Sequence, residues 1–236
     1  MNTSLRYDLE GNVATITIDD GKANVMSVSM LGAIDAALSR AETDKAVVVI
    51  QGRPGMFSGG FDLAVFQRDK EELFAMLKAG AELTERMLKF PYPVLAICTG
   101  HAIAMGAFLL LCADVRIGTM PDAKIQVNEV QIGLTLPHFA VEVCRQRLSP
   151  AHLNLAAITA TPYNQHQAVL AGFLDELVPP ELVAEVLRSR TAHLCKLHME
   201  SFSASKMRLR GPSLHLLRTA IAQDIDSWSK RFQGVA

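Results

Sequence analysis

Two glycine-containing segments carry the residue types from which an oxyanion-binding site is built. The first is Phe57-Ser58-Gly59-Gly60-Phe61-Asp62 and the second is Ala104-Met105-Gly106. Glycine lets the backbone pass close to a ligand, and a helix that starts after such a turn leaves its first amide N–H groups without partners. Two such turns on neighbouring strands could aim two N–H donors at one oxygen, as an enolate requires. Either turn alone is a weak indication, because Gly-Gly before a helix is more often plain turn chemistry.

Glu129 is the candidate acid or base. It lies in IQVNEVQIGL, a segment so apolar that an ionised carboxylate there is costly unless it is paired or used. Burial raises the pKa of a carboxyl group toward the range that suits a general base. The alternatives, a glutamate at an exposed loop edge or in a structural ion pair, stay open at this point.

Other polar residues are weaker candidates. His101 and His138 flank the two candidate segments without a partner at a recognisable spacing, so we expect solvated or core-edge histidines. Asp62 is expected to cap a helix and Asp114 to close one. The alternation of Lys206, Arg208 and Arg210 is typical of a solvated helix face.

Motifs of other enzyme classes are absent from the sequence. There is no G-x-S-x-G elbow, because the relevant stretch reads Gly55-Met56-Phe57-Ser58-Gly59, and no Lys-Ser/Thr follows it to complete a phosphate loop. Cys195 and His198 have a metal-like C-x-x-H spacing but no second pair, so an ordinary helix surface is favoured. We therefore expect neither a serine hydrolase nor a metal site.

The elements that must position these residues follow from the hydrophobic periodicity. LRYDLE and VATITID predict two strands joined by a Gly11-Asn12 turn, and Ser27 predicts the start of a helix. Strands are expected at 46–52 and from Val94, with a helix at about 68–89. Strand, small-residue turn and helix thus occur at 46–63 and again at 94–113, where GAFLLLCA is apolar all round and predicts a buried helix.

The second half of the chain is predicted to be mainly helical. Helix starts are expected at Ser149-Pro150, Thr161-Pro162, Pro179-Pro180-Glu181 and Gly211-Pro212-Ser213. We divide the chain into an α/β core, 1–175, and a helical oligomerisation segment, 176–236. An apolar stripe at helical spacing supports a role in oligomerisation, because another subunit could cover part of it. The alternative is that the stripe is buried inside one chain. The stripe comprises Leu214, Leu217, Ile221 and Ile225.

Composition excludes several classes of partner. The 23 Lys and Arg against 24 Asp and Glu leave a net charge of -1, which argues against nucleic acid as the main partner. The longest apolar run, between His101 and Asp114, is shorter than the roughly 18 residues of a membrane-spanning helix. No targeting signal is visible, and the four cysteines are widely spread, so we expect a cytoplasmic protein with reduced thiols and no membrane association.

In this order and at these distances, the two turns and Glu129 resemble the crotonase superfamily of enoyl-CoA hydratases and isomerases. RPGMFSGGFDL looks like the first oxyanion segment of the family, TGHAIAMGAFLLLCADVRI like the second, and NEVQIGL like the segment with the acid/base glutamate. The resemblance covers nearly the whole chain. It implies an α/β fold, a crotonase-like spiral of ββα units with a helical C-terminal segment, assembled as a homotrimer or a dimer of trimers.

The resemblance also implies the ligand and the residues that bind it. The substrate is an acyl-CoA thioester whose carbonyl oxygen is held by the amides of Phe61 and Met105, with Glu129 as acid/base. Coenzyme A is part of the substrate, so no separate cofactor and no metal are expected. The residues expected beside coenzyme A or the acyl end are Lys22, Ala23, Asn24, Gly59, Gly60, Asp62, Leu63 and Asn128.

Departures from the family pattern favour one reaction. Hydratases of the family have a second glutamate three residues after the second oxyanion donor, where this chain has Phe108. Dienoyl-CoA isomerases resemble it less, because they have further carboxylates around Phe108 and Pro137. An apolar residue at 108 resembles the Δ3,Δ2-enoyl-CoA isomerases, which is the activity we expect. The alternatives are an enoyl-CoA hydratase and a non-catalytic acyl-CoA-binding protein.

Overall fold

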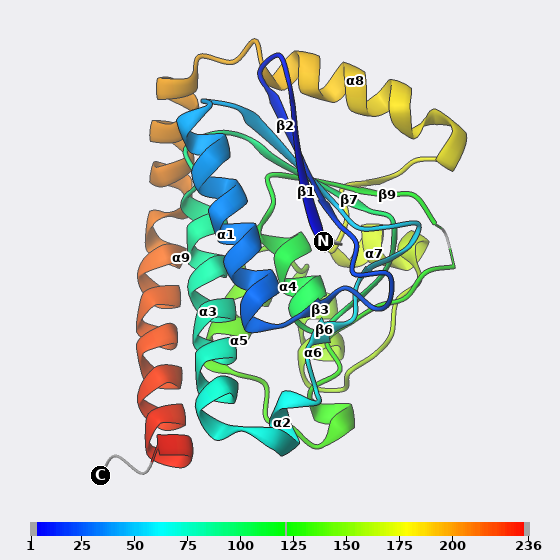
Figure 1. Cartoon of the computed structure of the whole chain (residues 1–236). Helices are drawn as coiled ribbons and strands as arrows, with labels where there is room; N and C mark the ends of the chain where they lie inside the picture. Colours follow the sequence, from blue (N-terminus) through cyan, green and yellow to red (C-terminus); the bar gives the residue numbers. More distant parts are fainter. Residues whose placement is uncertain (1–3, 121, 234–236) are drawn as a thin grey trace.

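The computed structural model describes residues 4–120 and 122–233 of the chain (Figure 1). Its largest sheet has six strands in the order β1, β2, β4, β7, β9, β11. β1 and β2 are antiparallel, as the turn at Gly11 predicts, and every later pair is parallel. The strands are Leu5–Glu10 (β1), Val13–Ile18 (β2), Val47–Gln51 (β4), Val94–Cys98 (β7), Val115–Gly118 (β9) and Glu176–Leu177 (β11).

Short strands that follow the long ones form two smaller sheets. One has the order β10, β8, β5 and the other pairs β3 with β6. The chain therefore repeats a long strand, a short strand in another sheet, and a helix, which confirms the predicted α/β spiral of ββα units. The short strands are Val25–Met26 (β3), Gly55–Ser58 (β5), Gly60–Phe61 (β6), Gly100–Ile103 (β8) and Ile125–Gln126 (β10).

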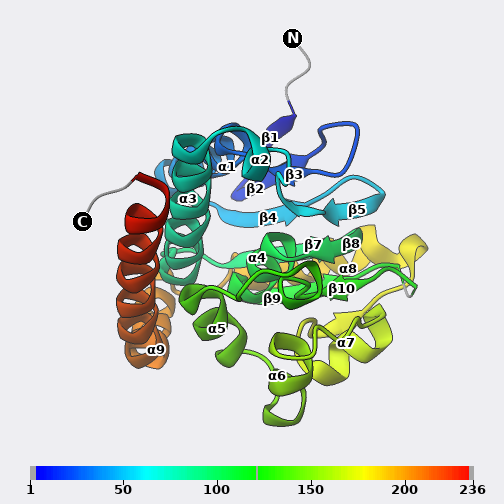
Figure 2. The same ribbon diagram turned by 90° about the horizontal axis from the view of Figure 1, so that it is seen from below.

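Two helices of the first half begin after a residue whose side chain caps them, and Ser27 is the cap that the sequence predicts. Ser27 accepts a hydrogen bond from the amide of Met30 at the start of α1, Val28–Thr43. Asp69 does the same for two amides at the start of α3, Lys70–Lys89, which follows the single turn α2, Val65–Arg68. Helix α4, Met105–Cys112, is buried on every side, as its composition predicts. Figure 2 shows α3 between α1 and the long helix α9, Met199–Trp228.

Two of the predicted helix starts in the second half are wrong. Helix α7 begins after Asn164, which forms a capping box with Gln167, and not at Thr161-Pro162. Pro212 lies inside α9, because the helix is held on both sides of it, by the ion pair of Arg210 and by burial of Leu214.

The other helices are α5, His138–Arg145, α6, Pro150–Ala157, α7, Gln165–Ala171, and α8, Val183–Leu194. Single 3-10 turns cover Val130–Ile132 and Pro180–Leu182, and a π-helical turn covers Ser229–Gln233.

A buried charge cluster corrects the prediction of a solvated basic face on α9. Lys206 Nζ lies 2.9 Å from one oxygen of Asp114, and Arg210 Nη2 lies 3.0 Å from the other. Residues 206 and 210 are four apart and share the inner face, whereas Arg208 is exposed. Asp114 also accepts a hydrogen bond from the amide of Val94, so α9 is joined to the sheet by ionic contacts.

The apolar stripe of α9 is covered within the chain. Leu214, Leu217 and Ile221 belong to the main hydrophobic core, where α9 packs against α3 and α5. The alternative interpretation, a stripe buried inside one chain, therefore describes these residues. The stripe gives no support to subunit association, which stays a prediction. Among residues 4–120 and 122–233, no helix combines the length and the apolar character needed to cross a membrane.

Candidate active site

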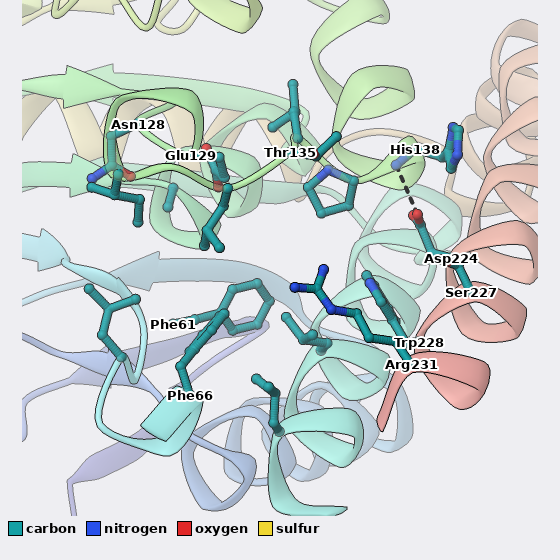
Figure 3. Close-up of a pocket in the computed structure, with 18 of the residues that line it drawn as sticks. Phe61, Phe66, Asn128, Glu129, Thr135, His138, Asp224, Ser227, Trp228 and Arg231 are labelled. Carbon is teal, nitrogen blue, oxygen red and sulfur yellow. Dashed lines mark hydrogen bonds between the residues drawn. The ribbon is translucent and has the colours of Figure 1, made fainter. Parts of the chain in front are cut away.

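A cavity of about 440 Å³ lies between the turns that follow β5 and β8 and the end of α9 (Figure 3). Its volume is in the range of small-molecule sites. Predicted site residues that line it are Gly59, Phe61, Leu63, Asn128 and Glu129. The remaining lining residues are Phe66, Leu73, Leu77, Ala104, Ile132, Leu134, Thr135, Leu136, Pro137, His138, Asp224, Ser227, Trp228, Arg231 and Phe232.

The two glycine turns are in direct contact. A Cβ atom on Gly60 would lie 2.8 Å from the carbonyl oxygen of Ile103, and one on Gly106 would lie 2.7 Å from that of Ser58. Larger residues would therefore force the turns apart. Helix α4 begins directly after Ala104, which lines the cavity, so the Met105 amide belongs to a first turn without partners inside the helix. This arrangement suits the predicted pair of N–H donors.

The side chains of Phe61 and Met105 have room beside α3. A Cβ atom on Gly80 would lie 2.6 Å from the ring of Phe61 and 3.4 Å from the sulfur of Met105. Gly80 thus creates the space into which both side chains pack. Met105 is fully buried, while Phe61 also contributes to the cavity wall. The bulk of these two residues does not block the turns that carry their amides.

The small sheet brings Glu129 to the second turn. Strand β10 pairs in parallel with β8, and the amide of Ala104 donates to the carbonyl of Gln126 at 2.8 Å. Glu129 follows three residues after Gln126, and its own carbonyl accepts from the amide of Leu134 at 2.9 Å. The three segments found in the sequence therefore converge because β5, β8 and β10 are neighbours in one sheet.

Glu129 is buried but not paired. Its side chain reaches the cavity, only 6% of the residue is exposed, and Oε2 has no hydrogen-bond partner within the described part of the chain. Desolvation by burial raises the pKa of Glu129 to about 7. Both alternatives left open by the sequence, an exposed loop edge and a structural ion pair, are thereby excluded. A carboxyl with this pKa can accept and return a proton near neutral pH.

Asn128 adds a second polar atom beside Glu129. Its Oδ1 is buried in the cavity wall and, among residues 4–120 and 122–233, has no hydrogen-bond partner. Leu63 is 54% exposed and lies on the wall near the first turn. Asp62 accepts a hydrogen bond from the amide of Ala64 within the turn. The expected helix cap is wrong, because α2 begins after Ala64 without a side-chain cap and α3 is capped by Asp69.

The predicted coenzyme A loop lies against the first turn. The amide of Gly59 donates to the carbonyl of Ala23 at 2.7 Å, and Lys22 is exposed. Asn24 is fully buried, and its side-chain amide donates to three backbone carbonyls, of Ile18, Met56 and Phe57. Asn24 therefore holds the loop in place and does not present its amide group to a ligand. Contacts of Lys22 and Ala23 with coenzyme A stay a prediction.

Sequence reasoning missed the wall that α9 contributes. Asp224, Ser227, Trp228 and Arg231 lie at helical spacing and face the cavity, with Phe232 beside them (Figure 3). The usable signal was a tryptophan and charged residues continuing the face of the apolar stripe.

Asp224 connects this wall to the segment after Glu129. Its two oxygens accept hydrogen bonds from the amides of His138 and Phe139, at 3.0 and 2.8 Å, at the start of α5. His138 is exposed, in agreement with the predicted solvated histidine, and it also lines the cavity. His101, in contrast, accepts a hydrogen bond from the amide of Lys124 through Nδ1 and does not line the cavity.

Position 108 holds no polar group. Phe108 is fully buried and packs edge-on against Phe139 with a ring-centroid distance of 5.8 Å. Phe139 in turn packs against Trp228 at 6.3 Å. This aromatic row supports the wall of the cavity from behind and supplies no second carboxylate.

The C-x-x-H pair is structural. His198 Nδ1 accepts a hydrogen bond from the amide of Ser201 and caps α9, while Cys195 lies near the carbonyl of Asn12. Within residues 4–120 and 122–233, no group of three or more His, Cys, Asp or Glu side chains is placed to hold a metal ion.

A model of the enoyl-CoA hydratase/isomerase family matches residues 8–234. The chain belongs to this family. The predicted membership of the crotonase superfamily is thus confirmed, and with it the fold class and the general class of enzyme. A probable enoyl-CoA hydratase of Bacillus subtilis is 33% identical over 132 residues, 54% of this chain and 50% of its own length.

Solved structures of the family cover almost the whole chain. An enoyl-CoA hydratase/isomerase family protein from Pseudomonas syringae is 39% identical with a TM-score of 0.92, covering 94% of this chain and 97% of its own. An enoyl-CoA isomerase of Mycobacterium tuberculosis is 37% identical with a TM-score of 0.89. The match covers 98% of this chain and 100% of the mycobacterial chain. A second structure of the same mycobacterial protein is named a probable enoyl-CoA hydratase. Similarity therefore establishes the family without separating the two reactions.

Proposed function

We propose that this family member is a Δ3,Δ2-enoyl-CoA isomerase. Its substrate is a 3-enoyl-CoA thioester, with coenzyme A as part of the substrate and no separate cofactor. Glu129 transfers the proton, and the amides of Phe61 and Met105 hold the thioester oxygen. Coenzyme A follows the loop at Lys22 and Ala23 toward Gly59, with Asn128 near the acyl end.

The proton moves through one carboxylate. Glu129 in its ionised form takes a proton from C2, and the electron pair of that C–H bond delocalises onto the thioester oxygen as a dienolate. The two amides stabilise this negative charge. The Glu129 carboxylic acid then returns the proton to C4, which leaves the double bond between C2 and C3 and regenerates the carboxylate.

The observation that carries the proposal is that Glu129 is the one unengaged carboxylate in the cavity wall that the structure describes. Asp224 is the other carboxylate there, and both of its oxygens hold amides of α5. Isomerisation needs one base, which serves C2 and C4 in turn. Hydration must also activate a water, and the position where family hydratases hold a second glutamate is the buried Phe108.

Enoyl-CoA hydratase is the second candidate. Several relatives are named hydratases. Asp224 is a carboxylate in the cavity wall, and hydration would require it to activate a water from the α9 side. A protein that binds acyl-CoA without turnover ranks third, because an amide N–H persists whatever the side chains of Phe61 and Met105.

One pair of assays tests the three functions. Purified protein is given 3-hexenoyl-CoA and, separately, 2-hexenoyl-CoA, and products are separated by liquid chromatography. We expect rapid conversion of the first to 2-hexenoyl-CoA and little 3-hydroxyhexanoyl-CoA from the second. Dominant hydration of 2-hexenoyl-CoA would establish the hydratase instead, and binding without either product would establish the non-catalytic protein.

We also propose that the active form is a homotrimer or a dimer of trimers, on the basis of the family resemblance alone. Light scattering at micromolar concentration measures the mass directly. A stable monomer of 25.7 kDa would overturn this assignment while leaving the assignment of Glu129 in place.

A further inference from the structure

Arg231 places a cation in the wall of a largely apolar cavity. It lies in the π-helical turn Ser229–Gln233 that ends α9, a local geometry that is rare and often found at functional sites. Figure 3 shows its guanidinium pointing into the cavity from the same wall as Trp228. Leu73, Leu77 and Leu136 are among the apolar residues that line the space in front of it.

The segment that carries Arg231 is held by contacts, while the Arg231 side chain itself is exposed. Asp224, two helical turns earlier on the same face, is tied to the start of α5 by two hydrogen bonds. Trp228 packs edge-on against Phe139, with a centroid distance of 6.3 Å, and the Arg231 guanidinium lies 5.5 Å from the ring centroid of Phe232. The turns of α9 that precede Arg231 are thus tied to α5, and the π-helical turn itself packs against α3.

The carboxylates of the cavity wall do not neutralise Arg231. Asp224 is engaged by backbone amides, and no ion pair joins it to Arg231 among the described residues. The pKa of Glu129 is raised by burial, and no neighbouring cation counteracts that rise. The adjacent cation Lys230 differs, since it pairs with Asp226 on the exposed side of the helix at 2.9 Å. Arg231 therefore remains available to an anionic group of a bound ligand.

We propose that Arg231 selects acyl-CoA thioesters whose acyl chain ends in a carboxylate. This inference rests on the proposed acyl-CoA substrate and names its class. The guanidinium has a planar fork of donors that matches a carboxylate in two parallel hydrogen bonds. A chain that passes Glu129 and crosses the apolar space would bring its far end to the α9 wall, where Thr135 and Ser227 also line the cavity.

The phosphates of coenzyme A are the other source of negative charge. Their predicted path follows Lys22 and Ala23, and the carbonyl of Ala23 accepts a hydrogen bond from the amide of Gly59 in the first turn. Arg231 lies in the π-helical turn after α9, away from Asn128 in Figure 3, and apolar residues that fit a hydrocarbon chain line the cavity with it. The terminal carboxylate of the acyl chain is therefore the better match.

Calorimetric binding of two unreactive ligands tests the proposal. Adipoyl-CoA and hexanoyl-CoA have acyl chains of the same length, and only the first ends in a carboxylate. We expect Arg231→Gln to weaken adipoyl-CoA about tenfold to a hundredfold more than hexanoyl-CoA, as lost hydrogen bonds to a charged group imply. Arg231→Lys should recover part of the difference. Lys230→Gln, which removes a neighbouring charge outside the cavity wall, should leave the ratio of the two dissociation constants at its wild-type value.

The same acyl groups on N-acetylcysteamine distinguish the two anions, because these thioesters lack the phosphates. The proposal requires the adipoyl preference, and its loss in Arg231→Gln, to persist with them. Equal weakening of both CoA ligands that disappears without phosphates would assign Arg231 to coenzyme A and overturn the proposal. Unchanged affinities would overturn it as well. Neither ligand reacts, so failure of the isomerase assay and failure of this inference are separate results.

Discussion

Glu129 combines two properties that rarely coexist in a merely structural carboxylate, burial and an unpaired oxygen. Leaving a buried polar group without a partner costs stability, so such an atom is more readily explained by a ligand or a reaction. Within the part of the chain that the structure describes, Glu129 Oε2 and Asn128 Oδ1 are both of this kind, and the two residues line one cavity. Two adjacent acceptor oxygens without protein donors indicate a binding surface for a ligand that supplies hydrogen-bond donors or a proton.

Replacing Glu129 with Gln tests its role as the base. The amide preserves volume but cannot accept a proton from C2, so kcat for 3-hexenoyl-CoA should fall by about 10²- to 10⁴-fold or more. Binding of hexanoyl-CoA, measured by calorimetry, should stay within a few-fold of wild type. Glu82→Gln, at an exposed position of α3, is the matched control and should retain full activity. Near wild-type turnover by Glu129→Gln would mean that another group, such as His138, is the base.

The raised pKa of Glu129 predicts the pH dependence of the reaction. The ionised form is the base, so kcat/KM should rise with pH and reach a plateau above about 7. A profile that is already flat at pH 5 would contradict the burial of this carboxyl.

Stability should change with pH in the opposite sense. Between pH 4.5 and about 7 the folded chain holds a proton on Glu129 that the unfolded chain releases, so this group makes the free energy of unfolding fall as pH rises. Urea unfolding at pH 5 and pH 8 should show a loss of about 3 kcal/mol or less from this source. In Glu129→Gln, the loss of unfolding free energy between pH 5 and pH 8 should be smaller by the contribution of Glu129, so this variant serves as the comparison.

At the scale of elements, the link between α9 and α5 holds the wall of the cavity. Replacing Asp224 with Ala leaves the amides of His138 and Phe139 without their acceptors, which should cost about 1–3 kcal/mol of unfolding free energy. Urea titration measures the loss. Asp226→Ala, two residues along the same helix but in an exposed ion pair, should change stability by about 0.5 kcal/mol or less. Equal effects of the two variants would show that the link does not stabilise the fold.

Local patterns predicted the longer strands and helices of the first half and the convergence of the site, but not the short elements β3, β5, β6 and α2. Alternation marks β2, a capping serine marks α1, and apolarity on all sides marks α4. These features depend on residues close together in the chain. The two turns and Glu129 could also be found, because glycines and a carboxylate in apolar surroundings are unusual enough to be noticed.

Contacts between distant segments could not be predicted in this way. In the sequence, Lys206 and Arg210 look like a solvated pair. The structure places Asp114 beside both of them, although Asp114 and Lys206 are 92 residues apart in the chain. Pro212 looks like a helix start until the anchors on either side are known. The α9 wall of the cavity was missed for the same reason. Its tryptophan and charged residues mark one face of a helix, but the segments that this face meets are distant in the sequence.

On the scale of the whole molecule, the cluster around Asp114 joins the last helix to the central sheet. Lys206 and Arg210 are both mostly buried and share this one carboxylate. Burial and the neighbouring arginines lower the pKa of Lys206 to about 8, although Asp114 acts in the opposite direction. Three cations, with Arg147 as the third, gather at the end of α4, where a helix dipole is negative.

Asp114→Asn should therefore destabilise the entire fold. It removes the charge that compensates two buried cations, a change that typically costs about 3–5 kcal/mol. Thermal and urea unfolding of the variant measure it, with Asp8→Asn at an exposed ion pair as the control. A cost below about 1 kcal/mol would show that water reaches the cluster and replaces the carboxylate.

The division of the cavity between tightly packed turns and one face of α9 has a consequence for how such enzymes diverge. Almost any side chain at Gly60 or Gly106 would collide with the opposite turn, so the part that handles the thioester has little freedom to mutate. Ser227, Trp228 and Arg231 project from a helix whose hold on the sheet lies elsewhere, at Lys206 and Arg210. A gene copy could thus acquire a new acyl preference through changes in the few codons that specify this face, and a library randomised at these positions is the natural starting point for laboratory evolution.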